Sequence, residues 1–465
     1  MSSTVRYFWL YFGVLWLGAG CVEPAGPATV ATTTPPAAGV PARCSGSPVQ
    51  MRVKPLSPYV YQQGDGYAYF DVWLQACPVP GATRQPLDIS LVVDTSGSMG
   101  GQKIGHARAA AQYLLSVLTA RDRLALVSYN TDITILFPLT AVTPQNRGWM
   151  SQRIAGLHAT GMTNLGGGLD IGVRQLAAAQ ERQAIQRTIL ISDGLANVGV
   201  TSPVALNGMA SSARQRGVSV TTMGVGLRFN ELLLQSLAEY GGGRYHYIRD
   251  AQALLPIFRQ EIAGVQATVA TSVELTVAGC PGCRVVEAPG YALKRVGDHT
   301  RIVVSDLAGG QRRKTLIKVR LPRDRPGQRV VDVRLAYRSA QGARRVMRRS
   351  HRVAFMVTPN RRKVLATVDR AVADRVAHVR ASKTVNKAMQ AYQLGDATVA
   401  GNLLRGAASR LEAQYRATGS RRALKRARRL RKAARKVTRY RAPASAPALD
   451  TLKRMRFDAA EATRH

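Results

Sequence analysis

Hydrophobic and polar positions follow two periods along the middle of the chain. Leu87–Asp94 (LDISLVVD) is an apolar run with the length of a buried parallel strand, and Lys103–Ala120 follows with apolar residues at helical spacing. Asp122–Ser128 and Ile133–Leu139 predict an antiparallel edge pair, because only a few polar residues separate them. The remaining elements alternate in the same way: helices over 167–180, 204–215, 230–240 and 251–262, and strands over 188–193, 218–226 and 244–248. This order predicts a doubly wound, Rossmann-like α/β domain whose site lies at the carboxyl ends of its strands.

In the segments on either side of this domain, apolar and polar residues alternate, as they do in β-strands. Gln50–Leu74 alternates apolar and polar residues about the turn Gln63–Gly66, as a β-hairpin does. Thr268–Val357 gives about five further strand signals without a helix, a pattern typical of a β-sandwich. A sandwich that lacked its first strands would expose unpaired edges. We therefore expect the two segments to fold together, with the α/β domain inserted between them.

Helical spacing returns over Asn360–Tyr440 and predicts a three-helix appendage. Its last helix, Arg421–Arg439, carries eleven basic residues and no acidic one. Its predicted inward positions are Leu424, Ala427, Leu430, Ala434 and Val437. We expect 359–440 to form a basic helical hairpin or bundle and 441–465 to be a flexible tail.

The N-terminus predicts export. Arg6 precedes Tyr7–Ala19, an uncharged apolar run with the length of a signal-peptide core and too short for a comfortable membrane span. The run ends at Leu17-Gly18-Ala19-Gly20-Cys21, which is similar to a bacterial lipobox, although its leucine lies one place further upstream than usual. We expect lipidation of Cys21 after a signal peptide over 1–21; cleavage without lipidation, giving a periplasmic or extracellular protein, and an uncleaved anchor are alternatives. The Ala, Thr and Pro-rich segment 22–43 suits a tether to the membrane surface of the cell envelope.

Four further cysteines suggest two disulfides in an exported chain. The simplest pairing joins Cys44 to Cys77 and Cys280 to Cys283, the latter across the Pro281-Gly282 turn. A four-thiolate zinc site is the sharper alternative, but it requires a second CxxC, which the sequence lacks. A redox CxxC is a further alternative, and no thioredoxin-like strand and helix surround it.

The chain has 465 residues, enough for about three domains. It carries 66 Lys+Arg against 27 Asp+Glu, a net charge of +39 that predicts attraction to a polyanion. From Gln311 to His465 there are 42 basic and 9 acidic residues, whereas the first 310 residues carry 24 and 18. The excess therefore belongs to the C-terminal part and indicates either a solvated basic face or a contact with anionic lipid or envelope polymer. Nucleic acid is not expected, because the chain is exported and only Tyr440 could stack near the arginines.

Candidate chemistry stands at the predicted strand ends. The first strand stops at Asp94-Thr95-Ser96-Gly97-Ser98, a later loop carries Thr163, and another strand ends at Asp193. Three hydroxyls and two carboxylates thus meet at one edge, and such hard oxygens suit Mg²⁺ most, with Mn²⁺ or Ca²⁺ as alternatives. DTSGSMG read alone could instead be a Ser/Gly turn that caps the next helix.

These residues resemble a von Willebrand factor type A domain with a complete metal-ion-dependent adhesion site, DxSxS plus a downstream Thr and Asp, over Pro86–Ile262. The resemblance implies that Ser96, Ser98 and Thr163 supply hydroxyl ligands. Asp94 and Asp193 would act through waters or orient the ligands. One position would remain for an exposed Asp or Glu of a protein partner.

The order of segments resembles bacterial exported relatives of calcium-activated chloride channel regulators and inter-alpha-trypsin inhibitor heavy chains, although no segment here could form a pore. No G-x-S-x-G elbow or HExxH motif is present, so we do not expect an enzyme. The leading hypothesis is a membrane-tethered adhesion protein; the alternative is a structural envelope protein that docks through its basic helices, with the metal only stabilising. We further expect an N-terminal β segment over 44–86, a type A domain over 87–263 and a β-sandwich over 264–358.

Overall fold

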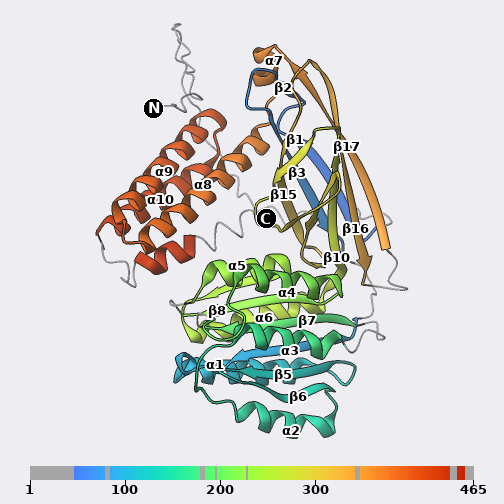
Figure 1. Cartoon of the computed structure of the whole chain (residues 1–465), viewed down its shortest axis with the longest axis vertical. Coiled ribbons are helices and arrows are strands. Elements are labelled where there is room, and N and C mark those ends of the chain that lie inside the picture. The colour runs from blue at the N-terminus through green and yellow to red at the C-terminus, as the bar shows by residue number, and fades with distance from the viewer. Residues whose placement is uncertain are drawn as a thin grey trace, which may run out of the picture. The chain divides into compact units, whose positions relative to one another are not determined.

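The computed structural model describes residues 47–78, 84–177, 184–193, 196–226, 229–340, 346–439 and 448–455. Its central domain has a six-stranded sheet in the order β6-β5-β4-β7-β8-β9, with helices on both faces (Figure 1). Strand β6 is antiparallel to β5 at one edge, as the sequence predicts, and the other pairs are parallel. The strands are β4 (Leu87–Asp94), β5 (Arg123–Tyr129), β6 (Ile133–Ala141), β7 (Ile185–Ser192), β8 (Ser219–Val225) and β9 (Gly242–Ile248).

Two hydrophobic clusters hold the helices on this sheet. Helices α1 (Gln102–Val117), α2 (Pro144–Ala155) and α6 (Leu254–Gln266) cover one face. Helices α3 (Leu165–Ala177), α4 (Pro203–Gln215) and α5 (Glu231–Tyr240) cover the other. Strands β4, β7 and β8 are buried along their whole length, which explains their continuous apolar runs.

Among the described α-helices of this domain, the sequence pattern did not predict α2. It buries only Met150 and Ile154, so its apolar periodicity is weak. Residues at its N-terminus favour the helix instead. Thr143 caps it by accepting a hydrogen bond from the Asn146 amide, and Pro144 is its first residue, a position where proline is favourable.

The flanking segments form one β-sandwich, as expected. One sheet has the order β1-β3-β15-β11 and the other β12-β13-β10-β16-β17-β2, with β14 paired to β10. The N-terminal strands are β1 (Val49–Pro55), β2 (Tyr59–Tyr61) and β3 (Tyr67–Ala76). The later strands are β10 (Thr268–Gly279), β11 (Arg284–Glu287), β12 (Leu293–Val296), β13 (His299–Val303), β14 (Leu307–Ala308), β15 (Arg312–Arg320), β16 (Gly327–Ser339) and β17 (Val346–Thr358). The expected N-terminal hairpin is modified, because β2 leaves it and pairs in parallel with the end of β17.

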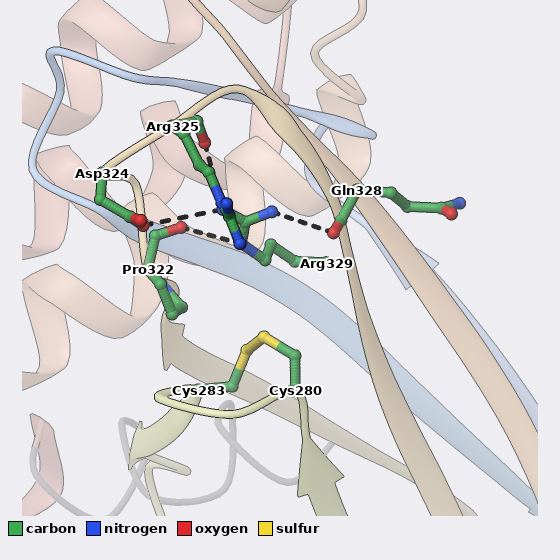
Figure 2. The surroundings of a disulfide bond; sticks show 7 residues. All are labelled: Cys280, Cys283, Pro322, Asp324, Arg325, Gln328 and Arg329. Carbon is green, nitrogen blue, oxygen red and sulfur yellow. Dashed lines mark hydrogen bonds and ion pairs between the residues drawn. A yellow bond between two sulfur atoms is a disulfide. The ribbon is translucent and has the colours of Figure 1, made fainter.

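The sandwich is held together by strand pairing between its two segments and by a disulfide, both of which the sequence predicts. Strand β3 pairs with β15 from Tyr67 to Gln75, which joins segments far apart in sequence. Figure 2 shows the Cys280–Cys283 disulfide, whose Cα atoms lie 5.1 Å apart. Gly282 sits in the turn between them with a φ of +77°, a backbone conformation that glycine adopts without strain. This pairing is confirmed.

Beside that turn, Figure 2 shows that the Arg329 guanidinium ties together the connection between β15 and β16. It donates hydrogen bonds to the carbonyl oxygens of Pro322 at 3.2 Å and Arg325 at 3.1 Å. The disulfide and this arginine therefore fix two adjoining turns at one end of the sandwich.

The C-terminal region is helical, with α7 (Arg361–Ala366), α8 (Arg370–Gln393), α9 (Ala397–Thr418) and α10 (Arg421–Arg439). Asp369 and Asp396 cap α8 and α9 by accepting hydrogen bonds from the Val372 and Val399 amides, each three residues on. Helix α9 packs against both α8 and α10 around a core rich in alanine and leucine. No described helix is long and apolar enough to cross a membrane.

The expectation of a flexible tail over 441–465 is wrong for 448–455, which is helical. Ala448 and Leu452 are fully buried in the same core as α9 and α10. Asp450 accepts a hydrogen bond from the Tyr247 hydroxyl at 3.0 Å, and Lys453, 1% exposed, donates to the Phe229 carbonyl at 3.2 Å. Eight residues give too little periodicity to reveal this packing from the sequence.

A buried polar network lies at the amino ends of β7 and β8. Arg187 donates to Glu261 at 3.1 Å and to Asp306 at 3.0 Å, and Arg214 donates to the other Asp306 oxygen at 2.8 Å. Burial opposes ionisation of Asp306, but the charges of Arg214 and Arg187 hold the pKa of its carboxyl below the usual range. Because Asp306 follows β13, the network joins the α/β sheet to the sandwich.

Candidate functional site

Asp94 ends β4, whose neighbours are β5 and β7, so its carboxylate stands in the middle of the carboxyl edge of the sheet. The side chain is fully buried. One oxygen accepts a hydrogen bond from the Ser96 amide at 2.9 Å, and the other accepts from the Ser192 hydroxyl at 2.7 Å. Burial raises the pKa of the Asp94 carboxyl, although these hydrogen bonds act in the opposite direction. A cation beside this carboxylate would compensate its desolvation.

Ser96, Ser98 and Asp193 form a continuous chain of oxygens. The two serine hydroxyls lie 3.1 Å apart, and the Ser98 hydroxyl donates to Asp193 Oδ1 at 2.6 Å. Ser98 belongs to the short 3-10 helix Gly97–Met99 between β4 and α1, whereas Asp193 directly follows β7. Residues 95 positions apart are thereby brought into direct contact.

Thr163 stands on the loop before α3, and hydrogen bonds tie this loop to both of the others. The Gly97 amide donates to the Gly161 carbonyl at 3.0 Å. The Thr163 amide donates to the Asn197 side chain at 2.8 Å, and the Asn197 amide returns a bond to the Thr163 carbonyl at 3.1 Å. Thr163 is 4% exposed, and its hydroxyl has no hydrogen-bond partner within the described part of the chain. The described residues therefore leave that hydroxyl available to a ligand.

A lysine already supplies positive charge at this edge. The Lys103 ammonium contacts Asp193 Oδ2 and donates to the Ser98 carbonyl at 3.0 Å. The Asp193 side chain is fully buried and that of Lys103 is 35% exposed. Lys103 lies in the first turn of α1, where the helix dipole disfavours a cation, so the carboxylate is what makes this position favourable.

The donor set fits a hard divalent cation. Its side-chain atoms are hydroxyl and carboxylate oxygens, with no histidine or cysteine among the five residues. The Thr163 hydroxyl, which has no hydrogen-bond partner among the described residues, and the Asp193 carboxylate, which already attracts a cation, are the features such an ion would use. Ser96, Ser98 and Thr163 would hold it directly, with Asp94 and Asp193 supplying the negative charge around it. A bound cation would act there as a Lewis acid toward an oxygen ligand.

Hydrogen bonds thus link the three loops that carry the five predicted residues, Asp94, Ser96, Ser98, Thr163 and Asp193. Cys77 is disulfide-bonded. Its predicted partner Cys44 lies outside the described residues, as do Cys21 and the whole predicted signal and tether.

Three residues that support the site were not predicted from the sequence. Ser192 and Asn197 have no distinguishing pattern around them. Lys103 has a weak signal: the helix dipole disfavours a basic residue in the first turn, and an anionic neighbour would offset this.

Comparison with known proteins shows what the central domain is similar to. Residues 88–260 match the model of the von Willebrand factor type A domain. The chain is 29% identical over 192 residues to the uncharacterized protein YfbK of Escherichia coli (strain K12), a match that covers 41% of this chain and 33% of that protein. It is 30% identical over 200 residues to inter-alpha-trypsin inhibitor heavy chain H4 of Homo sapiens, covering 41% of this chain and 22% of that protein. The matches thus span a third or less of the length of these two relatives.

Two solved structures share the fold over most of the described chain. A von Willebrand factor type A protein from Catenulispora acidiphila superposes with a TM-score of 0.68 at 20% identity, covering 83% of this chain and 89% of that one. The ArnB paralog VWA2 from Sulfolobus acidocaldarius gives 0.57 at 15% identity, covering 85% and 98%. The chain carries a von Willebrand factor type A domain over 88–260, a domain that serves in general for metal-dependent protein binding.

Proposed function

We propose that this type A domain captures a protein ligand through a divalent cation, Mg²⁺ in the first place, held by Asp94, Ser96, Ser98, Thr163 and Asp193. The observation that carries the proposal is the joined set of three loops at one sheet edge. Hydroxyl oxygens come from the Ser96–Ser98 loop and the Thr163 loop, and carboxylates stand at the ends of β4 and β7. The same proposal makes the protein an exported binding protein, tethered to the cell envelope through Cys21, and not an enzyme.

The chemistry of the ligand follows from the charge of the site. Hydroxyl ligands are neutral, so three of them leave a bound cation with most of its positive charge. A partner carboxylate then gains more from completing the coordination than a neutral group would. We therefore expect the protein partner to present an exposed Asp or Glu at the contact.

Asp94→Asn tests the role of the site. We expect the variant to lose Mg²⁺ binding in isothermal titration calorimetry and to lose every envelope protein that the wild type retains with Mg²⁺ but not with EDTA. Asp132→Asn is the matched control, because Asp132 is an exposed carboxylate that follows β5 at the same end of the sheet. Thermal unfolding of both variants without metal shows that each is folded.

Retention by Asp94→Asn of both Mg²⁺ binding and the captured proteins would overturn the proposal. Binding of the same proteins by the wild type in EDTA would overturn the metal-dependent mechanism.

A further inference from the structure

Helix α10 exposes a straight row of positive charge. Its outward residues recur at intervals of four and three, so they lie above one another along one side of the helix. We call this row the cationic ridge; it consists of Arg421, Lys425, Arg428, Lys432, Arg435 and Arg439, all exposed. At the rise of an α-helix the ridge is about 27 Å long.

The opposite side of α10 fixes the direction in which the ridge points. Ala423, Ala427, Leu430, Ala434 and Val437 are buried in the core that α10 shares with α9. The small alanines bring the two helices close together, and Arg431 adds two hydrogen bonds of 2.6 Å to Glu412 of α9. The ridge therefore belongs to an anchored helix and faces away from the helical core.

No described residue neutralises the ridge. None of its six side chains forms an ion pair or hydrogen bond within the described part of the chain, and α10 itself contains no acidic residue. Like charges three and four residues apart repel one another, and two arginines in the first turn, Arg421 and Arg422, oppose the helix dipole. An array of anions along the ridge would remove both unfavourable effects.

The shape of the ridge favours a flat anionic surface. Side chains that radiate from one exposed helix form a convex line, which a plane can contact along its whole length. Proteins that hold single-stranded nucleic acid use a groove with aromatic platforms, and α10 carries no aromatic residue. Exposed large apolar side chains are also absent from α10, so the contact does not require insertion.

We propose that the cationic ridge of α10 binds the headgroups of anionic phospholipids on a membrane surface. Arginine guanidinium groups bind phosphate through paired hydrogen bonds, and basic residues near an anionic bilayer each add to its attraction. The N-terminal apolar segment expected from the sequence would bring the chain to such a surface. The inference does not depend on the metal site, because α10 lies outside the residues matched by the type A family.

Vesicle sedimentation of the full-length protein tests the proposal. The assay compares vesicles of phosphatidylcholine alone with vesicles containing about 30% phosphatidylglycerol. An apolar N-terminal segment binds both kinds, so the difference in binding between them reports the contribution of the ridge. We expect at least about tenfold stronger binding to the anionic vesicles at about 0.05 M NaCl, and loss of that preference at about 0.5 M. The ridge variant Lys425→Gln/Arg428→Gln/Lys432→Gln/Arg435→Gln should lose the preference at low salt as well.

A second variant with the same net charge controls for general basicity. Arg320→Gln/Arg325→Gln/Arg348→Gln/Arg349→Gln removes four exposed arginines from the sandwich, and it should keep the preference for anionic vesicles within about threefold. Circular dichroism checks that the ridge variant remains helical; if it does not, Arg428→Gln/Lys432→Gln replaces it, with Arg348→Gln/Arg349→Gln as its control.

Three results would overturn the proposal. Equal loss in ridge and control variants would assign the effect to net charge. Equal binding of the wild type to neutral and anionic vesicles would assign it to the N-terminal segment. Ridge-dependent binding of a short DNA duplex without binding to anionic vesicles would make the partner a soluble polyanion.

Discussion

Replacing Lys103 should strengthen metal binding to the site, because its ammonium occupies the carboxylate that a cation needs. Lys103 contacts Asp193 Oδ2 and the Ser98 carbonyl. A divalent cation must either displace the ammonium or bind beside a second positive charge. Lys103→Met removes the charge and keeps a side chain of similar length, so Asp193 becomes fully available.

The size of the effect follows from the exposure of the pair. Asp193 is fully buried but the Lys103 side chain is 35% exposed, so solvent screens their attraction. Two unit charges about 4 Å apart interact by about 4 kcal/mol near a protein surface and by about 1 kcal/mol in water. Ordering the lysine side chain offsets part of this, and exposed pairs contribute at most about 1 kcal/mol. Because Asp193 is fully buried, this pair should lie somewhat above that bound, at about 1.4 kcal/mol, which is a tenfold change in affinity.

Isothermal titration of the metal-stripped full-length protein with Mg²⁺ measures this change. We expect the Kd of Lys103→Met to be about tenfold lower than that of the wild type. Lys103→Arg keeps the charge and should leave the Kd near the wild-type value, as should Lys387→Met, which removes an exposed lysine from α8. Unchanged or weaker Mg²⁺ binding in Lys103→Met would refute the competition between ammonium and metal.

Three further predictions concern stability. Asp306→Asn should lower the free energy of unfolding at neutral pH by about 3 kcal/mol, because it removes the carboxylate that pairs with buried Arg214 and leaves buried Arg187 with Glu261 alone. The pKa of Asp306 is lower in the folded state, so its contribution to stability is present above the unfolded pKa and is lost as pH falls through the folded value. Denaturant curves of wild type and variant should therefore converge as pH falls below about 4. A difference in the free energy of unfolding that stays constant with pH would contradict this. Gly172→Ala would place a Cβ 2.3 Å from a Val92 methyl group, and calorimetry should show a loss of about 1 to 3 kcal/mol. Cys280→Ser opens the four-residue loop to Cys283 and should cost about 2 kcal/mol in denaturant unfolding under oxidising conditions, with no difference from wild type in reductant.

The sequence by itself determined the elements and the candidate site to a large extent. The continuous apolar run Leu87–Asp94 predicted a buried parallel strand, and the polar carboxyl ends of such strands meet at one edge of the sheet. The spacing of Ala427, Leu430 and Val437 predicted α10 with its observed bounds, because the buried positions of an amphipathic helix recur every three or four residues in the sequence. Alternation at period two likewise predicted strands on both sides of the inserted domain.

Only the tertiary structure decided which distant groups meet. The pairing of Lys103 with Asp193, the bonds of Asn197 to the Thr163 loop and the network around Asp306 each join residues from separate elements. The sequence around these residues does not reveal the contacts, because a hydrogen bond or ion pair depends on positions in space and produces no repeating pattern along the chain. The same reason explains the packing of 448–455, whose helical conformation is stabilised by a core built from other segments.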